Sequence, residues 1–173
     1  MASWQEEFLG ATQGEQCEHA VFQEIETAAR ALGFEHCAFG LRAAPLVSYP
    51  KTIILNNYAA SWWARYVNAD YLQVDLAVPP GRRTHSSPAL NDKIFASTRQ
   101  LWDDARCCGL RVRSTASSLE AMGVAGLLTL ARAQPALSAK EFASQDIKLR
   151  WLVNVSHQTL YRIFASRPRV VSL

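Results

Sequence analysis

The most informative stretch of this sequence is Asn57-Tyr-Ala-Ala-Ser-Trp-Trp-Ala-Arg-Tyr66, which is followed, after three intervening residues, by Asp70-Tyr-Leu-Gln-Val-Asp75. Tyr58, Trp62 and Tyr66 recur at every fourth position, so on a helix their side chains form one aromatic stripe. The stripe carries two hydroxyls and one indole N–H at the edge of an apolar surface. Such a stripe belongs to a hydrophobic core more often than to a ligand site, so by itself it is only compatible with a small-molecule pocket.

Asp75 lies in the apolar segment Val74-Asp-Leu-Ala-Val78. Burying a carboxylate is costly unless a partner donates hydrogen bonds to it, and no cationic residue is adjacent in the sequence. A ligand N–H is one such donor. The structural alternative is an N-cap or a turn residue, and both interpretations stay open on these residues alone.

Hydrophobic spacing outward from this stretch predicts alternating helices and strands. We expect helices at Gln16–Leu32, Ala59–Ala69, Phe95–Cys108 and from the capping box Ser138-Ala-Lys-Glu141 to about Phe164, strands at His36–Arg42, Thr52–Asn56, Arg111–Ser117 and Gly123–Arg132, and a long loop at Val78–Pro88. This order predicts an α+β fold, an α-β-α sandwich with a central antiparallel sheet and a ligand cavity between sheet and helices.

The last predicted helix is apolar on two sides. One face carries Leu149, Leu152, Ser156, Leu160 and Ile163, and a second carries Ile147, Trp151 and Val155. Because a helix with two apolar faces should bury both, we expect one of them to face a partner subunit in a homodimer.

The composition indicates one globular domain, because 173 residues with 49% apolar side chains suffice for a sizeable core. No apolar run approaches the roughly 20 residues that span a bilayer, and the acidic N-terminus does not resemble a secretory signal. We therefore expect a cytoplasmic protein without a membrane segment. The net charge is only +3 and the basic residues are scattered, so this chain alone is not expected to bind DNA.

Motifs of common enzyme classes are missing from the sequence: there is no GxSxG, no Walker loop, no HExxH and no GxGxxG after a strand. The candidate nucleophiles are Cys37 and Cys107, with His36 or His85 as the base. His36 and Cys37 are neighbours in a predicted strand and point to opposite faces, so they cannot pair directly. The dispersed cysteines indicate reduced thiols, and we expect no enzyme, no metal site and no cofactor.

The order of several motifs resembles the autoinducer-binding domain of LuxR-type quorum-sensing transcriptional regulators. The pattern Asn-Tyr-x-x-x-Trp-x-x-x-Tyr, with a later Tyr-x₃-Asp, is similar to the core signature of that family. Further similar segments are Gly33–Gly40, Leu101–Arg106 leading to Gly109-Leu110, and Gly123–Arg132. The resemblance covers nearly the whole chain, and it implies a sensor domain that binds an N-acyl homoserine lactone.

The resemblance also implies residue roles. The Trp62 indole would donate to the lactone carbonyl, and Asp75 would accept from the ligand amide N–H. Tyr58 and Thr129 would donate to the acyl amide carbonyl, while Tyr66 would pack against the ligand. The predicted ligand-binding set is completed by Leu90 and Trp102. Leu90 stands where the family usually has a second Trp, and the other departures are Leu76, Arg113 and Pro79-Pro80.

The resemblance divides the chain into an autoinducer-binding domain at 1–165 and, at 166–173, the start of a linker to a helix-turn-helix domain that is not in this sequence. DNA binding is then expected only through that domain. The end of the chain is compatible with a fragment boundary or with a naturally truncated regulator that pairs with full-length relatives. An alternative function is a LuxR-like regulator that acts through dimer contacts without a ligand.

Overall fold

The computed structural model describes residues 3–42, 52–71, 92–110, 112–119, 125–133 and 138–166. The helices and strands are α1 (Trp4–Thr12), α2 (Glu18–Ala31), β1 (His36–Arg42), β2 (Thr52–Asn56), α3 (Ala60–Asn68), α5 (Asp92–Cys107), β3 (Val112–Leu119), β4 (Ala125–Arg132) and α6 (Ala139–Ala165). The strands form one sheet in the order β2-β1-β4-β3, and every neighbouring pair is antiparallel. The predicted helices and strands are thus confirmed, with ends that differ by up to three residues.

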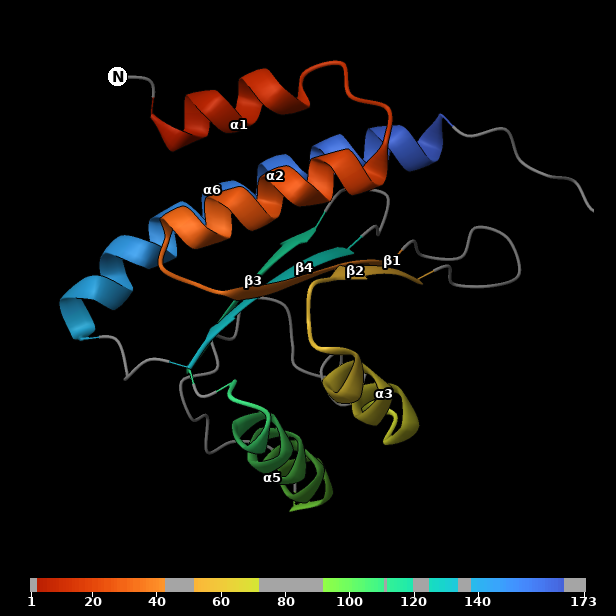
Figure 1. The fold of residues 1–173 in the computed structure, drawn as a ribbon, viewed down its shortest axis with the longest axis vertical. Helices are drawn as coiled ribbons and strands as arrows, with labels where there is room; N and C mark the ends of the chain where they lie inside the picture. Colours follow the sequence, from red (N-terminus) through yellow and green to blue (C-terminus); the bar gives the residue numbers. More distant parts are fainter. Residues whose placement is uncertain are drawn as a thin grey trace, which may run out of the picture.

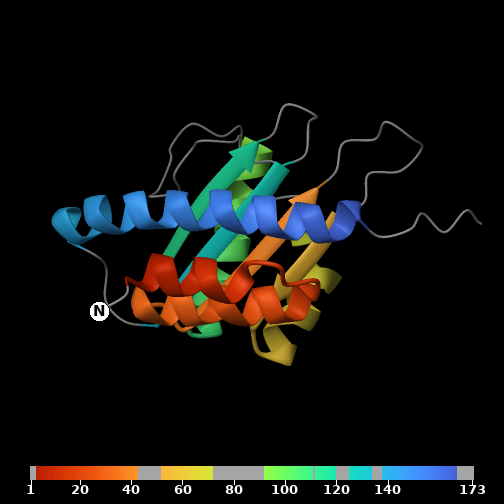
Figure 2. The same cartoon turned by 90° about the horizontal axis from the view of Figure 1, so that it is seen from above.

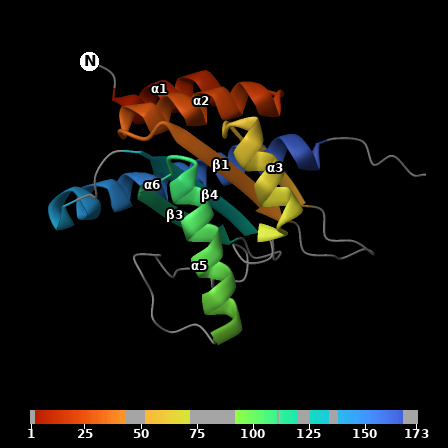
Figure 3. The same cartoon turned by 60° about the horizontal axis from the view of Figure 1, so that its bottom comes forward.

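Helices cover both faces of this sheet (Figure 1). The helices α1, α2 and α6 lie on one side, and Figure 2 shows α6 running across the strands beside α2. The helices α3 and α5 lie on the opposite side (Figure 3). This arrangement confirms the predicted α-β-α sandwich with a central antiparallel sheet.

The main core lies between the sheet and the α2–α6 layer. Side chains alternate along a strand, so every second residue of β1 and β4 points toward this layer. The buried core residues of these strands are Cys37, Phe39, Leu41, Leu128 and Leu130, and they pack with Val21, Ile25, Leu152, Val153 and Leu160 of α2 and α6. We call this side of the sheet the α6 face and the opposite side the α3 face.

Glycines with a left-handed backbone follow two of the helices, and a capping box begins a third. Gly33 after α2 has φ of +86°, and Gly109 after α5 has φ of +82°, a backbone region that favours glycine. At the start of α6, the Ser138 side chain accepts from the Glu141 backbone N–H while the Glu141 carboxylate accepts from the Ser138 N–H. The predicted capping box is therefore present.

The helix α1 was missed by the sequence prediction, and it corrects the interpretation of α6. Trp4 and Phe8 of α1 make edge-to-face contacts with Trp151, at centroid distances of 5.3 and 6.0 Å. The second apolar face of α6 is therefore covered at Trp151 by the same chain rather than left open for a partner. Ile147 on that face remains 72% exposed.

Other predictions lie outside the described residues. The loop at Val78–Pro88, the Pro79-Pro80 pair and the segment 167–173 belong to these, so the boundary after residue 165 stays a prediction. Among the helices that the structure describes, none combines the length and the apolar character needed to cross a bilayer.

Candidate functional site

The α3 face of the sheet is less completely covered than the α6 face. Along β1 the exposure alternates, so that Cys37, Phe39 and Leu41 are buried, whereas Ala38 and Gly40 keep partial exposure. In the antiparallel register Ala38 lies opposite Thr129 of β4, and Gly40 lies opposite Leu127. At Ala38 and Gly40 the centre of the α3 face therefore carries small residues that keep partial exposure.

An aromatic cluster covers one end of this face. Its buried members are Trp62, Tyr71, Leu101, Ala105, Leu110 and Ala131, and Tyr58 and Tyr66 pack against them. Trp62 is 4% exposed and Tyr71 is 3% exposed. Trp62 is the buried residue of α3, and it shares the cluster with Leu101 and Ala105 of α5 and with Ala131 of the sheet.

The rings in this cluster meet in defined geometries. Tyr71 stacks on Trp62 with a centroid distance of 6.2 Å and an interplanar angle of 29°. Tyr66 meets Trp62 and Tyr71 edge to face, at 6.1 Å from each. On its other side Tyr66 stacks on Trp63 at 5.5 Å. Such pairs contribute about 0.5–1.5 kcal/mol each beyond simple burial, so the cluster is a preorganised aromatic wall.

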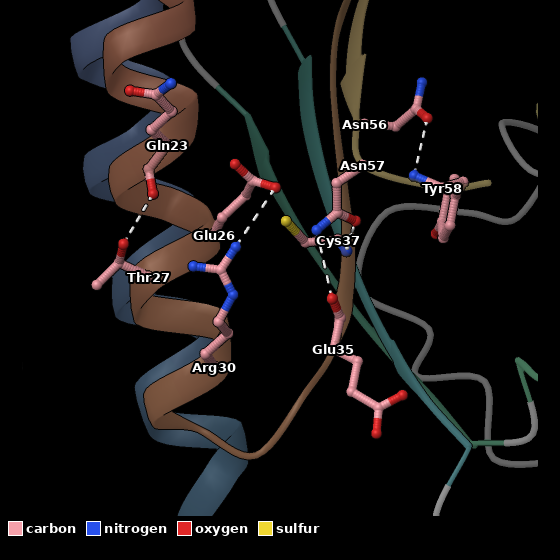
Figure 4. Close-up of polar contacts among 9 residues, drawn as sticks. All are labelled: Gln23, Glu26, Thr27, Arg30, Glu35, Cys37, Asn56, Asn57 and Tyr58. Atoms are coloured by element: carbon pink, nitrogen blue, oxygen red, sulfur yellow. Dashed lines mark hydrogen bonds and ion pairs between the residues drawn. The ribbon is translucent and has the colours of Figure 1, made fainter. Parts of the chain in front are cut away.

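Tyr58 reaches this wall from outside the helix. The predicted stripe placed it on a helix with Trp62 and Tyr66, but α3 begins at Ala60, so this part of the prediction is wrong. The Asn57 side chain accepts from the Cys37 backbone N–H at 2.8 Å and donates to the Glu35 carbonyl at 3.3 Å (Figure 4). The Asn56 side chain accepts from the Tyr58 N–H at 3.2 Å.

These bonds hold the segment before α3 against β1 in a non-helical conformation. They direct the Tyr58 ring to the side of the sheet away from α2 (Figure 4). There it lies 6.0 Å from the His36 ring. Tyr58 therefore joins the α3 face through side-chain capping of the backbone, not through helical periodicity.

A charged network joins α3 to α5 beside the cluster. Nη2 of Arg65 lies 2.6 Å from Oδ1 of Asp104, and the Tyr71 hydroxyl donates to Oδ2 of the same carboxylate. The hydrogen bond from Tyr71, together with Arg65, holds the pKa of Asp104 below its usual value. Burial and the bond to Asp104 raise the pKa of Tyr71 to about 12, so Tyr71 is a neutral donor at neutral pH.

The structure brings most of the predicted ligand-binding residues to the α3 face. Tyr58, Trp62 and Tyr66 lie in the cluster. Thr129 is buried at 3% exposure, two residues before Ala131 and on the same side of β4. Trp102 is partly buried on α5, one residue after Leu101.

Asp75, Leu90 and Leu76 lie outside the described residues, so their predicted roles stay predictions. Arg113 pairs through its backbone with Ala131, at the edge of the cluster. Tyr71, Asp104 and Arg65 are not among the residues predicted to bind the ligand. Tyr71 stood inside the quoted motif, but no periodicity relates it to Asp104, which lies 33 positions further along the chain.

Among the described residues, the candidate nucleophile Cys37 and the candidate base His36 do not form a catalytic pair. Cys37 lies in the core on the α6 face, where burial, with Glu26 nearby, raises the pKa of its thiol to about 12. His36 lies on the opposite face beside Tyr58, as the alternation of a strand predicts. Cys107 is exposed at the end of α5, and His85 lies outside the described residues. In the described part of the chain no group of three or more His, Cys, Asp or Glu is placed to hold a metal ion.

Comparison with known proteins identifies relatives over nearly the whole chain. The model of the autoinducer binding domain family matches residues 18–160. The chain is 34% identical over 170 residues to the transcriptional activator protein AnoR of Acinetobacter nosocomialis, covering 94% of this chain and 69% of AnoR. It is 37% identical over 140 residues to the transcriptional activator protein SolR of Ralstonia solanacearum, covering 81% of this chain and 59% of SolR. The chain thus spans about three fifths to two thirds of the length of these relatives.

A solved structure shares the fold over almost its entire length. The N-acylhomoserine lactone dependent LuxR family transcription factor CepR2 from Burkholderia cenocepacia superposes with a TM-score of 0.74 at 27% identity. The similarity covers 94% of this chain and 97% of that one. The layers and the sheet described above are therefore those of a known sensor fold.

Proposed function

Because this chain belongs to the autoinducer-binding domain family of LuxR-type quorum-sensing regulators, we propose that it binds an N-acyl homoserine lactone on the α3 face of its sheet. The observation that carries this proposal is the buried Trp62, which is enclosed by Tyr58, Tyr66 and Tyr71 beside a partly accessible sheet surface. The family consists of signal receptors and transcriptional regulators rather than enzymes.

The chemistry of this face matches the lactone head group. The head group presents a ring carbonyl, an amide carbonyl and one amide N–H. In our proposal the Trp62 indole donates to the ring carbonyl, and the hydroxyls of Tyr58 and Thr129 donate to the amide carbonyl. Asp75 accepts from the amide N–H, and Tyr66 packs against the ligand. A neutral hydrogen bond contributes about 0.5–1.5 kcal/mol and a bond to a carboxylate about 1.5–3 kcal/mol, so these contacts orient the head group.

The acyl tail is proposed to run over the centre of the sheet, away from the aromatic wall. A Cβ placed on Gly40 would meet no other atom within 4 Å, and the neighbouring Ala38 on the same face is also small. Each buried methylene of the tail contributes about 0.8 kcal/mol, so the length of this surface sets which tails bind best. Leu90, in place of a second Trp, is proposed to leave the head-group side wider than usual and to affect ligand choice.

The whole protein is proposed to regulate transcription in the cytoplasm. The named relatives are transcriptional activators, and we propose that this chain is their sensor portion. We propose that it forms a homodimer and that DNA is bound through a separate C-terminal domain. Sedimentation analysis of the purified chain with and without lactone tests the dimer, and a monomer under both conditions would contradict it.

The proposed site is tested by a matched pair of tryptophan variants. Trp62→Phe keeps an aromatic ring but removes the indole donor, so the lactone should bind up to about tenfold more weakly. Trp63→Phe is the control, because Trp63 lies next to Trp62 on α3, stacks on Tyr66 and has no proposed hydrogen bond to the ligand. Affinity is measured by calorimetric titration with a lactone of the best-binding tail length.

Asp75→Asn is expected to weaken binding further, because the carboxylate bond to the amide N–H is replaced by a weaker neutral one. The site is placed wrongly if Trp62→Phe and Asp75→Asn both bind the lactone as tightly as the parent chain. Circular dichroism confirms that each variant is folded, so that a loss of affinity is assigned to the site.

A further inference from the structure

We propose that Asp104 of α5 is a positioning residue of the ligand site, acting through Tyr71 on the indole of Trp62. This inference rests on the proposed lactone site. It gives a role to Asp104, which belongs neither to the sequence motif nor to the predicted ligand-binding residues. Asp104 does not lie in the aromatic cluster itself; it accepts hydrogen bonds from Arg65 of α3 and from Tyr71, which follows that neighbouring helix.

The first step runs from Asp104 to Tyr71. Tyr71 is 3% exposed, and its hydroxyl donates to Oδ2 of Asp104. A buried hydroxyl without a partner is costly, so this bond selects one orientation of the Tyr71 ring. The backbone supports the same placement. Asp70, two residues after the end of α3, takes a φ of +54°, and this turn directs the chain back so that Tyr71 packs against Trp62 of that helix.

The second step runs from Tyr71 to Trp62. The two rings are stacked at 6.2 Å with 29° between their planes, and Tyr66 meets both rings edge to face. A close-packed ring can rotate only if its neighbours move with it. Fixing Tyr71 from the outside therefore fixes the plane of the indole that is proposed to donate to the lactone.

Arg65 completes the network from α3. Its guanidinium lies 2.6 Å from Oδ1 of Asp104, so each carboxylate oxygen has its own donor. The Asp104 side chain is 13% exposed, whereas that of Arg65 is 54% exposed. Asp104 is thus the more buried residue of the pair, and its carboxylate accepts from both Arg65 and Tyr71. We therefore assign the positioning of the Tyr71 ring to Asp104 rather than to Arg65.

A positioning role for Asp104 predicts a loss of lactone affinity, whereas a role in packing alone predicts only a loss of stability. A hydrogen bond weakens steeply when its donor is misaligned, so a small rotation of the indole lowers lactone affinity without unfolding the domain. Removing either Asp104 or the Tyr71 hydroxyl should produce the same loss, because both belong to one chain of contacts. Removing both together should then cost no more than removing one.

The test compares Asp104→Asn and Tyr71→Phe, alone and combined, with Asp103→Asn as the matched control. Asp103 is the adjacent, exposed aspartate on the same helix. Two quantities are measured: lactone affinity by calorimetry, and the ¹⁵N–¹H resonance of the Trp62 indole in the ligand-free chain. That resonance is assigned by its loss in Trp62→Phe.

We expect Asp104→Asn and Tyr71→Phe each to weaken the lactone about tenfold, the double variant to match them, and both to shift the Trp62 indole resonance. Asp103→Asn should change neither quantity. If the variants only lower thermal stability while affinity and the Trp62 resonance stay as in the parent, Asp104 is merely structural and the inference is wrong. Tyr71→Phe removes one oxygen and leaves the Arg65–Asp104 pair intact, so it decides the question even if Asp104→Asn does not fold.

Failure of lactone binding and failure of the role of Asp104 give different experimental results. If the parent chain binds no lactone, the proposed function fails, and the indole resonance of the ligand-free chain alone then decides whether Asp104 positions Trp62. If the parent binds and the variants bind equally well with an unshifted resonance, the lactone site stands and the role of Asp104 is overturned.

Discussion

Gly126 of β4 lies directly against the imidazole of His157 of α6: a Cβ at position 126 would stand 3.0 Å from Nδ1 of His157. The same Cβ would be 2.6 Å from Oγ of Ser118, which makes a short hydrogen bond to that imidazole. Ser118 and His157 are both buried. The contact of α6 with the β3–β4 pair therefore depends on the absence of a side chain at Gly126.

Gly126→Ala should destabilise the domain by about 1–3 kcal/mol, because His157 and Ser118 must move apart to admit the methyl group. Gly40→Ala is the matched control in the neighbouring strand, where an added Cβ meets nothing within 4 Å. That variant should leave the free energy of unfolding unchanged or raise it by about 0.4–1 kcal/mol. Urea unfolding of the ligand-free chains measures both, and equal losses would show that α6 does not press on the sheet at this point.

Phe8→Ala should cost about 3–5 kcal/mol of stability, because Phe8 is 2% exposed and contacts Trp151 of α6. Leu9→Ala is its control, since Leu9 follows it on α1 but is 47% exposed, and its change should stay within about 0.5 kcal/mol. If thermal unfolding gives the same small change for both, α1 does not contribute to the core.

The cysteines should separate into two kinetic classes toward a thiol reagent such as Ellman's reagent. Cys17, Cys107 and Cys108 are exposed and should react at once in the folded chain. Cys37 is 0% exposed and should react only as the domain opens, so its rate should follow denaturant concentration. Rapid labelling of four thiols in the absence of denaturant contradicts the burial of Cys37.

Cys37 also gives an alkaline limit to stability. Burial raises the pKa of its thiol from 9.0 to about 12, so the folded state retains a proton that the unfolded state releases. The free energy of unfolding is therefore unaffected by Cys37 below pH 9 and decreases as the pH rises from 9 toward 12. Cys37→Ala should flatten this part of the profile of unfolding free energy against pH, and an unchanged profile would assign the alkaline loss to other groups.

Asp104 sets a limit at the acid end. The hydrogen bonds from Tyr71 and Arg65 lower the pKa of Asp104 in the folded chain. The ionised carboxylate therefore stabilises the fold fully above the pKa of a free aspartate, about 3.9. This contribution is lost as the pH falls through the lower pKa of Asp104 in the folded chain. Parent and Tyr71→Phe chains should therefore differ in unfolding free energy by a constant amount at neutral pH and converge in acid. A difference that stays constant down to pH 2 contradicts the link between this bond and the carboxylate charge.

The sequence predicted the sheet and its two helical layers because those elements carry local signals. The alternation of Cys37, Phe39 and Leu41 predicts a strand with one buried face, and Gly33 marks the end of α2. The helix α1 was missed because a nine-residue helix depends on tertiary contacts, here with Trp151. Its start was nevertheless marked, since Ser3 and Glu6 form the same capping box that was recognised at Ser138.

The site was only partly predictable, for a physical reason. Trp62 and Tyr66 share a helical face, so their spacing places them together. Tyr58 reaches the same cluster through the side chains of Asn56 and Asn57, which hold the backbone out of a helix. The pairing of Tyr71 with Asp104 depends on how α3 and α5 dock, and no local pattern in a single sequence encodes that register.

Lactone binding by this domain is tested most directly by a thermal-shift titration of the purified chain with N-acyl homoserine lactones of increasing tail length, each compared with its ring-opened N-acyl homoserine. We expect a rise in melting temperature that depends on tail length, since a ligand at a hundredfold excess over its Kd adds about 2.7 kcal/mol of stability. We also expect little response to the ring-opened compounds, whose carboxylate replaces the lactone carbonyl beside Trp62. A folded chain that responds to no lactone, or equally to both series, would contradict lactone binding at this site.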